Sequence, residues 1–371
     1  MRIGITGQNG FVGRHLYNTI GLYSEEFQLI DFQKEFFENE ELLDKFLTQC
    51  DVIVHLAAMN RHESEQVIYE TNVGLVNKLV GSLERIGSNA HVLISSSTQE
   101  ERDNLYGRSK REGREALNSW AERNGGKLTG LLVPNVFGSF GKPFYNSFIA
   151  TFCYQLTHEE TPTIATDGQV SLIYVQELVD FIVEQIRKDT HKPLCIVEPT
   201  STKKVSEVLA LLENYRDLYL EKGEIPQLND RFELNLFNTY RSFIDHKAIY
   251  PRKFQLHTDP RGTFVEIIRM GIGGQSSYST TVPGITRGNH FHTRKIERFA
   301  VIQGKARIQL RKMDSDEIMD FYLDGTEPSY VDMPIWYTHN ITNVGEEELI
   351  TMFWINEPYD PADPDTYFLE V

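Results

Sequence analysis

The pattern of apolar and polar positions changes about two-thirds of the way along this 371-residue chain. In the first part, short runs of consecutive apolar residues alternate with longer segments in which apolar residues recur every three or four positions. Such runs are typical of strands buried on both faces, and such segments of amphipathic helices. After an N-terminal strand we expect strands at 27–32, 51–58 and 91–97 and a helix over 69–87. This alternation predicts an α/β, Rossmann-like doubly wound parallel sheet.

After Pro251 the chain changes to short segments in which apolar and polar residues alternate, separated by glycine, proline and Asx turns. A period of two indicates strands with one buried face, and many short strands of this kind predict an antiparallel sandwich or barrel. The expected strands lie within 263–270, 275–282, 298–304, 305–313, 317–323 and 349–355. Residues 223–252 show no clear period and are expected to join the two parts. We therefore predict domains at 1–245 and 246–371.

The composition agrees with two folded domains and excludes some partners. Hydrophobic residues make up 40% and charged residues 24%, and the net charge is −16. An acidic excess repels a phosphate backbone, so nucleic acid is not an expected partner. No apolar run of membrane-spanning length and no leader pattern occurs, so no membrane association is expected. The three cysteines are far apart and form no CxxC pair, which is typical of reduced thiols in a cytoplasmic protein.

A glycine-rich turn follows the N-terminal strand, with Gly7, Gly10 and Gly13 in the spacing G-x-x-G-x-x-G. The first glycine permits a tight turn, the second lets backbone approach a pyrophosphate, and the third lets the helix pack on the strand. Asp31 ends the second strand, where a carboxylate can bond a ribose 2′-hydroxyl. The expected dinucleotide contacts are Gly7, Gly10, Phe11, Val12, Gly13, Asp31, Ala57 and Ala58.

Tyr106 and Lys110 are four residues apart, so on a helix they share one face. We expect the ammonium to lower the pKa of the phenol, which would let Tyr106 exchange a proton near neutral pH. Ser97 ends the preceding strand and could hydrogen-bond the same substrate oxygen.

Residues 1 to about 240 resemble the extended short-chain dehydrogenase/reductases that act on sugar nucleotides. The matching segments are TGQNGFVG, VIVHLAA, TN at 71–72, ISSS, YGRSK and VPNVFG. The resemblance implies nicotinamide hydride transfer at a sugar carbonyl, with Ser97, Tyr106 and Lys110 as the catalytic group. Ser97 and Tyr106 are only nine residues apart, much closer than in the family, which leaves Ser96 as an alternative to Ser97. The family's dehydratases carry an Asp-Glu pair where this chain has Thr98–Gln99, so a reductase or epimerase is expected.

A substrate-side helix is expected over 141–156. The candidate contacts to a nucleotide-sugar are Asn135, Lys142, Tyr145 and Asn146, with solvated loop residues as the alternative.

The second part carries a candidate metal site. Residues i and i+2 of a strand point to the same face, so His290 and His292 share a side, and Glu297 can return to it across a short turn. His339 is a fourth candidate. Three imidazoles and a carboxylate suit a divalent transition metal, and surface or core histidines are the alternative.

The spacing from Gly284 through these residues to Gly304 resembles the cupin motif, and Pro334, His339 and Asn343 resemble its second half. The resemblance implies a jelly-roll barrel over about 250–371. Trp336 replaces a glycine of the motif, which is expected to reshape the pocket mouth.

The segments DPRGTFVEI (259–267) and ITRGNHFH (285–292) also resemble the dTDP-4-keto-sugar 3,5-epimerases. Those enzymes are metal-free, and the histidine that corresponds to His290 is their base. We favour a ligand role for His290 because it lies in a full metal motif.

The whole arrangement resembles bifunctional capsular-polysaccharide enzymes that join a reductase to a cupin, down to YNSFIATFCY and DPADPDTYFLEV. The resemblance implies epimerisation at carbon 3 of a UDP-4-keto-6-deoxy-HexNAc and NADPH-dependent reduction at carbon 4. The product would be UDP-2-acetamido-2,6-dideoxy-L-talose, on the route to UDP-N-acetyl-L-fucosamine. It also implies Zn²⁺ or another divalent transition metal and a homodimer.

Asp31 would repel a 2′-phosphate, and Lys34 is the only nearby compensating cation, so NADH is the alternative to NADPH. Two other interpretations stay open: a reductase or epimerase with a purely structural cupin that mediates dimerisation, and a non-catalytic sugar-nucleotide sensor.

Overall fold

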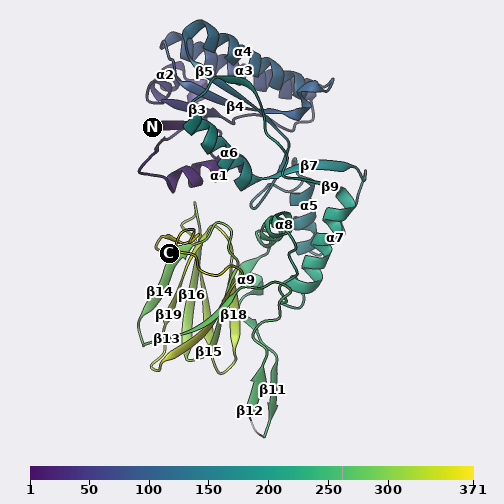
Figure 1. The fold of residues 1–371 in the computed structure, drawn as a ribbon, viewed down its shortest axis with the longest axis vertical. Helices are drawn as coiled ribbons and strands as arrows, with labels where there is room; N and C mark the ends of the chain where they lie inside the picture. The colour runs from purple at the N-terminus through teal and green to yellow at the C-terminus, as the bar shows by residue number, and fades with distance from the viewer. Residues whose placement is uncertain (261) are drawn as a thin grey trace. The chain divides into compact units, whose positions relative to one another are not determined.

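A computed structural model describes residues 1–260 and 262–371 of the protein. The described residues form two compact units, Met1–Thr151 with Ile164–Ser206 and Phe152–Thr163 with Glu207–Val371 (Figure 1). The division by packing therefore falls at 206/207 and differs from the expected boundary at 245/246, because the helices that follow Ser206 pack with the second unit. None of the helices in the described part of the chain combines the length and apolarity needed to cross a membrane.

The first unit is built on a parallel sheet with the strand order β2-β1-β3-β4-β5-β8. Its strands are β1 Arg2–Thr6, β2 Gln28–Ile30, β3 Val52–His55, β4 His91–Ser97, β5 Lys127–Val133 and β8 Lys192–Ile196. The predicted α/β parallel sheet is thus confirmed, with β2 and β3 shorter than expected.

Helices cover both faces of this sheet. Alternate residues of a buried strand point to opposite faces, so each strand contacts helices on both sides. Val52 and Val54 of β3 lie in a core with α1 and α6, whereas Ile53 lies in a second core with α2, α3 and α4. The helices are α1 Phe11–Gly21, α2 Glu40–Thr48, α3 Glu65–Arg85, α4 Leu105–Asn124 and α6 Val175–Lys188, with short helices η1 Lys34–Glu38 and η2 Thr98–Glu101. Because these strands are buried on both faces, their sequences are continuous apolar runs.

A small sheet with the order β6-β7-β9 follows (Asn135–Phe137, Gln169–Tyr174 and Ser201–Lys204). The helix expected over 141–156 is shorter than predicted, since α5 spans Phe148–Thr157. Phe140 and Phe144 adopt φ of 66° and 55°, a left-handed conformation that an α-helix excludes. The Ser147 hydroxyl then accepts a hydrogen bond from the Ala150 N–H (3.3 Å) at the helix start.

The segment 223–252, expected to join the two parts, contains a buried helix, α8 Arg231–Arg241. The Asp230 carboxylate caps it by accepting a hydrogen bond from the Glu233 N–H (2.8 Å). Nearly all of its residues are buried, including the polar Asn235, Asn238 and Thr239, so its burial does not follow the apolar pattern of the sequence. The structure thus has a helix within the segment for which no periodic element was predicted. The neighbouring helices are α7 Val205–Tyr215, η3 Arg216–Leu220 and α9 His246–Ile249.

The second unit carries two antiparallel sheets, as the alternating pattern predicted, with the orders β10-β18-β15-β20-β13 and β17-β16-β19-β14-β21 in the described residues. The first holds β10 Arg252–Lys253, β13 Gln275–Thr281, β15 Glu297–Gln303, β18 Ser329–Met333 and β20 Leu349–Ile355. The second holds β14 Thr286–Phe291, β16 Lys305–Lys312, β17 Ile318–Asp324, β19 Tyr337–Asn343 and β21 Tyr367–Phe368. A separate hairpin pairs β11 Leu256–Asp259 with β12 Gly262–Val265. The sheets meet through side chains such as Phe299 of β15, whose ring packs edge-on against His339 of β19.

Candidate functional site

The glycine turn of the first unit has the shape that the sequence predicted. The Gly10 N–H donates to the Gly7 carbonyl (2.9 Å), and α1 begins directly after Gly10 without a side-chain cap. A Cβ atom at Gly13 would lie 2.1 Å from the Gly7 carbonyl oxygen, so the helix can approach the turn only with glycine there. The first N–H groups of α1 are therefore presented to whatever binds at the turn.

The other expected dinucleotide contacts flank this turn. Phe11 and Val12 open α1, and Ala57 and Ala58 follow β3, with the Ala57 backbone against Gly7. Asp31 follows β2 and is exposed, and its carboxylate accepts a hydrogen bond from the Tyr17 hydroxyl (3.0 Å).

Tyr106, Lys110 and Ser97 come together at the carboxyl end of β4 and the start of α4. The Ser97 hydroxyl interacts with the Tyr106 phenol, whereas the Ser96 hydroxyl donates to the buried Glu100 carboxylate. Arg114 holds Glu100 in turn (2.7 Å). The serine beside the tyrosine is therefore Ser97.

The expected lowering of the Tyr106 pKa is not found. The pKa of this phenol is raised to about 12, because burial and Tyr145 raise it and the hydrogen bond with Ser97 only partly opposes them. The Lys110 ammonium donates to the Ser95 carbonyl (3.2 Å) and lies 5.9 Å from the Tyr106 ring centroid. Burial also lowers the pKa of Lys110 to about 8. Desolvation is thus the largest influence on the Tyr106 pKa, which the helical spacing alone could not reveal.

The short separation between Ser97 and Tyr106 is bridged by the single turn η2. The Asn104 side chain caps α4 by accepting a hydrogen bond from the Gly107 N–H (2.6 Å). A Cβ atom at Gly107 would lie 2.0 Å from the Gln99 carbonyl oxygen. Glycine at this position therefore lets α4 start against η2, which brings Tyr106 to Ser97 without a longer loop.

Sequence reasoning missed Asn60, whose side-chain oxygen accepts a hydrogen bond from the Tyr106 hydroxyl (3.3 Å). The buried Asn72 holds the segment that carries Asn60, because its amide bonds the N–H and the carbonyl of Met59 (2.7 and 3.0 Å) and reaches Ser109 of α4 (3.3 Å). Asn72 belongs to the TN pair at 71–72, one of the segments that match the family, and this match could have drawn attention to the neighbouring Asn60.

The candidate substrate residues are only partly brought together. Tyr145 raises the pKa of Tyr106. The backbone carbonyl of Tyr145 accepts a hydrogen bond from the Arg61 guanidinium (2.9 Å). Lys142 lies 5.2 Å from the Tyr145 ring centroid. Asn146 is exposed, and Asn135 lies on β6 with its amide bonded to the Ser171 carbonyl (3.3 Å).

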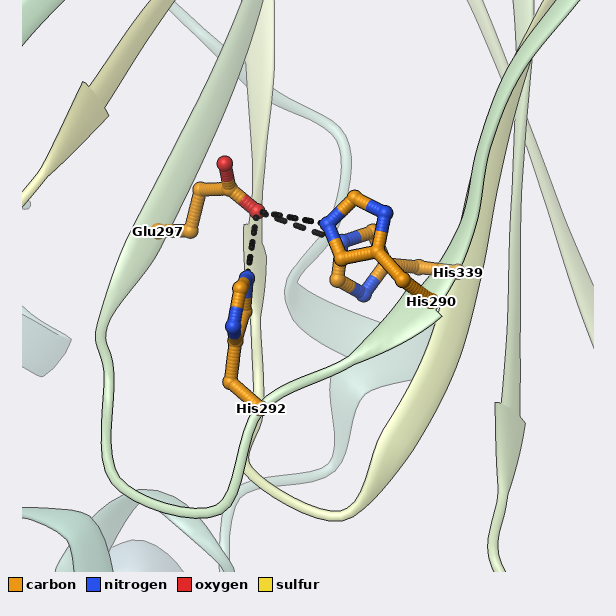
Figure 2. A group of neighbouring side chains, drawn as sticks. All are labelled: His290, His292, Glu297 and His339. Carbon is orange, nitrogen blue, oxygen red and sulfur yellow. Dashed lines mark hydrogen bonds and ion pairs between the residues drawn. The ribbon is translucent and has the colours of Figure 1, made fainter. Parts of the chain in front are cut away.

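In the second unit, His290, His292, Glu297 and His339 form one cluster, with ligand atoms all within 4.8 Å of one another. Figure 2 shows the Glu297 carboxylate facing the three imidazoles. Its Oε2 lies 3.3 Å from His292 Nε2, 3.2 Å from His339 Nε2 and 3.9 Å from His290 Nε2. The carboxylate comes from β15 in one sheet and the imidazoles from β14, its end, and β19 in the other. The cluster therefore connects the two sheets.

A β-bulge sets the register of the histidines. Gly288 pairs with Asn340 but His290 pairs with His339, so Asn289 is the extra residue, in a left-handed conformation (φ 60°). The bulge re-aims the end of β14. As a result His290 and His339 face each other directly, with ring centroids 4.5 Å apart.

Charge complementarity holds the cluster together. Burial raises the pKa of Glu297, but hydrogen bonds from His290, His292 and His339 outweigh burial and hold the pKa well below its usual range. Burial lowers the pKa of His292, yet Glu297 and Asp365 reverse this and raise it, whereas for His339 burial prevails and the pKa is lowered. His290 is the most accessible of the imidazoles, with 21% of its side chain exposed.

The second nitrogens of the imidazoles show that the cluster fits a metal ion. His292 Nδ1 bonds the Asp365 carbonyl (2.5 Å) and His339 Nδ1 bonds the Tyr337 carbonyl (3.2 Å). A carbonyl only accepts, so both Nδ1 atoms carry a proton, and both Nε2 atoms face the Glu297 carboxylate. At this distance each Nε2 either carries a proton that the carboxylate accepts or binds a cation that the carboxylate also binds. The donor set suits a divalent transition metal.

Trp336, which was expected to reshape the pocket mouth, lies in the interior of the second unit. Its side chain is buried and stacks on Phe291 (centroids 5.6 Å apart), and its backbone N–H donates to the His292 carbonyl (2.8 Å). Its φ is 61°, the left-handed conformation that glycine adopts most readily. The indole thus fills the interior beside Phe291.

Two family models match the chain. Residues 257–367 match the polysaccharide biosynthesis C-terminal domain, and residues 3–194 match the NAD dependent epimerase/dehydratase family. The chain belongs to the NAD dependent epimerase/dehydratase family. As a member, it carries the glycine turn and the serine, tyrosine and lysine group within the matched residues.

Full-length relatives extend the similarity to both units of this family member. It is 32% identical over 377 aligned residues to a UDP-2-acetamido-2,6-beta-L-arabino-hexul-4-ose reductase of Pseudomonas aeruginosa, covering 100% of this chain and 99% of the relative. The crystal structure of the capsular polysaccharide assembling protein CapF from Staphylococcus aureus is 34% identical, with a TM-score of 0.63 and complete coverage of both chains. A CapF structure with the inhibitor 3-isopropenyl-tropolone is 32% identical, with a TM-score of 0.59 and the same coverage.

Proposed function

We propose that the protein is a bifunctional nucleotide-sugar enzyme of polysaccharide biosynthesis. Its second unit epimerises carbon 3 of a UDP-4-keto-6-deoxy-HexNAc, and its first unit then reduces the carbon 4 ketone to give UDP-2-acetamido-2,6-dideoxy-L-talose, for UDP-N-acetyl-L-fucosamine. The observation that carries the proposal is the presence in one chain of a Ser97–Tyr106–Lys110 group and a His₃Glu cluster, together with full-length similarity to a hexul-4-ose reductase. The reductase machinery lies within 1–245 and the epimerase within 246–371.

In the reductase, a nicotinamide cofactor bound at the glycine turn supplies the hydride for carbon 4. Ser97 donates a hydrogen bond to the ketone oxygen, and Tyr106 gives that oxygen a proton as the new C–H bond forms. Because the pKa of Tyr106 is about 12, the phenol keeps its proton at neutral pH, as a proton donor must. Lys110 supplies positive charge beside the phenolate left behind, and Asn60 orients the hydroxyl.

For the second unit we propose a cupin jelly roll with Zn²⁺ or another divalent transition metal held by His290, His292, Glu297 and His339. A bound metal polarises an oxygen and stabilises negative charge that develops on it. A ketone at carbon 4 acidifies the hydrogen on carbon 3, so a site that stabilises the enolate lets that proton leave and return on the other face. The inhibitor in one CapF structure is a tropolone, a chelating hydroxyketone, which agrees with the metal proposed here.

The chemistry orders the two steps. Reduction removes the carbonyl that activates carbon 3, so epimerisation has to come first. Once the ketone is reduced, the new stereocentre no longer exchanges its proton. This ordering gives a physical reason for one chain to hold both sites.

NADPH is the proposed cofactor because of the family resemblance, and Asp31 is the residue that weakens its binding, since a carboxylate repels a 2′-phosphate. NADH is the alternative that Asp31 favours. We also propose Asn135, Lys142, Tyr145 and Asn146 as contacts to the UDP-sugar. A homodimer is proposed from the same resemblance, and sedimentation of the purified protein tests it.

One observation favours a structural role for the second unit. Four protein ligands complete a tetrahedral zinc site, whereas catalytic zinc keeps a position open for water or substrate. In this alternative the metal only stabilises the sheets, and the first unit is the sole catalyst.

The decisive experiment incubates the full-length protein with a UDP-4-keto-6-deoxy-HexNAc in D₂O without nicotinamide cofactor. Reduction is then blocked, and mass spectrometry is expected to show one deuterium gained at carbon 3. Tyr106→Phe should keep this exchange and lose at least about 100-fold of the NAD(P)H oxidation rate. Glu297→Gln should lose the exchange. Absence of exchange in the metal-loaded wild type would favour the structural alternative, and loss of both activities in a folded Tyr106→Phe variant would contradict separate sites.

A further inference from the structure

The C-terminal segment returns to the His₃Glu cluster through one buried carboxylate, that of Asp365, which is 2% exposed. Its Oδ1 accepts hydrogen bonds from the N–H and the hydroxyl of Thr293 (3.0 and 2.6 Å). Its Oδ2 accepts from the N–H groups of Arg294 (3.0 Å) and Lys295 (3.1 Å). A single side chain thus binds three successive backbone N–H groups and one hydroxyl.

The loop that Asp365 holds joins two members of the cluster, because residues 293–296 connect His292 to Glu297. The remaining N–H of this loop, that of Ile296, donates to the Asn356 side chain (2.8 Å), which also belongs to the C-terminal segment. Each backbone N–H from 293 to 296 is therefore bound by a side chain 60 or more residues away in sequence. The conformation of the loop depends on these contacts, since it lies outside the strands.

Asp365 also acts through its backbone. Its carbonyl accepts the proton of His292 Nδ1 (2.5 Å), which leaves Nε2 as the atom that faces Glu297. The buried Lys295 ammonium donates to the neighbouring Pro364 carbonyl (2.8 Å). Asp365 itself adopts a left-handed conformation (φ 41°), in which its side chain and its carbonyl both reach the loop.

We propose that Asp365 is a positioning residue for the metal centre, holding the 293–296 loop and the His292 ring so that His292 and Glu297 present their ligand atoms together. This inference rests on the proposed metal-binding role of the cluster. Groups that orient metal ligands in this way typically change metal affinity about 10- to 100-fold when they are removed. The proposal places part of the metal site in a segment that contributes no ligand.

The role requires a carboxylate. In D365N the amide oxygen could still accept from Thr293, but the new amide nitrogen cannot act as an acceptor, so the N–H groups of Arg294 and Lys295 would face a donor. Asp363 provides a matched control, because it lies on the same segment and pairs with the Arg294 guanidinium (2.8 Å) through a side chain that is 69% exposed. An exposed pair of this kind contributes little.

The experiment compares the full-length wild type with D365N, D363N and Thr293→Val. Zn²⁺ affinity is measured by competition with a chelator, and the visible absorption of the Co²⁺-loaded proteins reports ligand geometry. Circular dichroism and thermal unfolding check that each variant is folded. We expect D363N to match the wild type, D365N to bind Zn²⁺ about 10- to 100-fold more weakly with an altered Co²⁺ spectrum, and Thr293→Val to lose about two- to ten-fold.

The outcomes separate this inference from the function on which it rests. Wild-type affinity and an unchanged Co²⁺ spectrum in folded D365N would overturn the positioning role while leaving the metal centre intact. A wild type that binds neither Zn²⁺ nor Co²⁺ would overturn the metal centre itself. If D365N does not fold, Thr293→Val decides, because it removes one hydrogen bond and keeps the carboxylate, and an unchanged affinity there would refute the proposal.

Discussion

A buried ion pair joins β15, the strand that carries Glu297, to the neighbouring strand β18 of the second unit. Arg298 follows Glu297 on β15 and pairs across the sheet with Asp332 of β18. Its Nε and Nη2 donate to the two Asp332 oxygens (2.7 and 3.0 Å), and the Tyr219 hydroxyl of η3 donates to the same carboxylate (2.7 Å). The two charged side chains are 3% and 1% exposed, so water cannot replace either partner.

Replacing Asp332 by asparagine leaves the Arg298 guanidinium buried without a counter-charge. Breaking a buried pair in this way costs about 3–5 kcal/mol of unfolding free energy. Replacing both residues by apolar ones (Arg298→Met with Asp332→Leu) is expected to recover part of this loss, because the Arg298 charge is removed while the buried Arg241, which also faces Asp332, still lacks its counter-charge. The single variant should therefore be less stable than the double variant.

The assay is hydrogen–deuterium exchange in increasing urea, read from peptides covering 297–303 and 329–333, so that the second unit is followed by itself. A loss of about 3–5 kcal/mol lowers the urea midpoint of this unit by roughly 1–3 M. Asp320→Asn is the control, since Asp320 is an exposed carboxylate 3.9 Å from Arg307 and should change stability by less than about 0.5 kcal/mol. A loss below about 1 kcal/mol in Asp332→Asn would refute the reasoning.

The same pair predicts a pH dependence. Burial raises the pKa of Asp332, but Arg298, Arg241 and Tyr219 together outweigh burial and lower it below the value of about 3.9 in an unfolded chain. The stability from this shift is therefore present above about pH 4 and is lost as the pH falls through the folded pKa. The difference between wild type and Asp332→Asn should shrink in that acidic range.

Three further predictions concern the first unit. Gly107→Ala should reduce the rate of NAD(P)H oxidation at least about ten-fold, because the new Cβ would lie 2.0 Å from the Gln99 carbonyl oxygen. Gly74→Ala is the control and should leave the rate unchanged, because the space around Gly74 is open. Equal rates in the two variants would contradict the packing argument. Since burial lowers the pKa of Lys110 to about 8, the positive charge is lost as the pH rises through that value, and the oxidation rate should fall there; a rate that stays flat to about pH 10 would exclude a role for this charge. Asp31→Asn should raise kcat/KM for NADPH relative to NADH by about ten-fold or more, measured with both cofactors, and an unchanged ratio would show that Asp31 does not select the cofactor.

Much of the architecture followed from local periodicity. Apolar runs and alternating segments identified the parallel sheet and the antiparallel sheets, because burial on two faces or on one leaves a distinct period in the sequence. The exception was α8, in which polar residues such as Asn235, Asn238 and Thr239 are buried together with the apolar ones. The helix at 148–157 was placed too early because the left-handed turns at Phe140 and Phe144 follow no residue-type rule.

Residue types and spacings were enough to locate both candidate sites approximately, because each group lies on a strand end or a helix face with a fixed spacing. The packing of the folded chain was needed to show which serine meets Tyr106, that burial raises the pKa of that phenol, and that Asn60 bonds its hydroxyl. Packing also brought Asp365 to a loop some 70 residues earlier in the chain. Desolvation and contacts between distant segments depend on how the elements pack. Neither produces a period or a spacing in the sequence, so neither could be predicted from it.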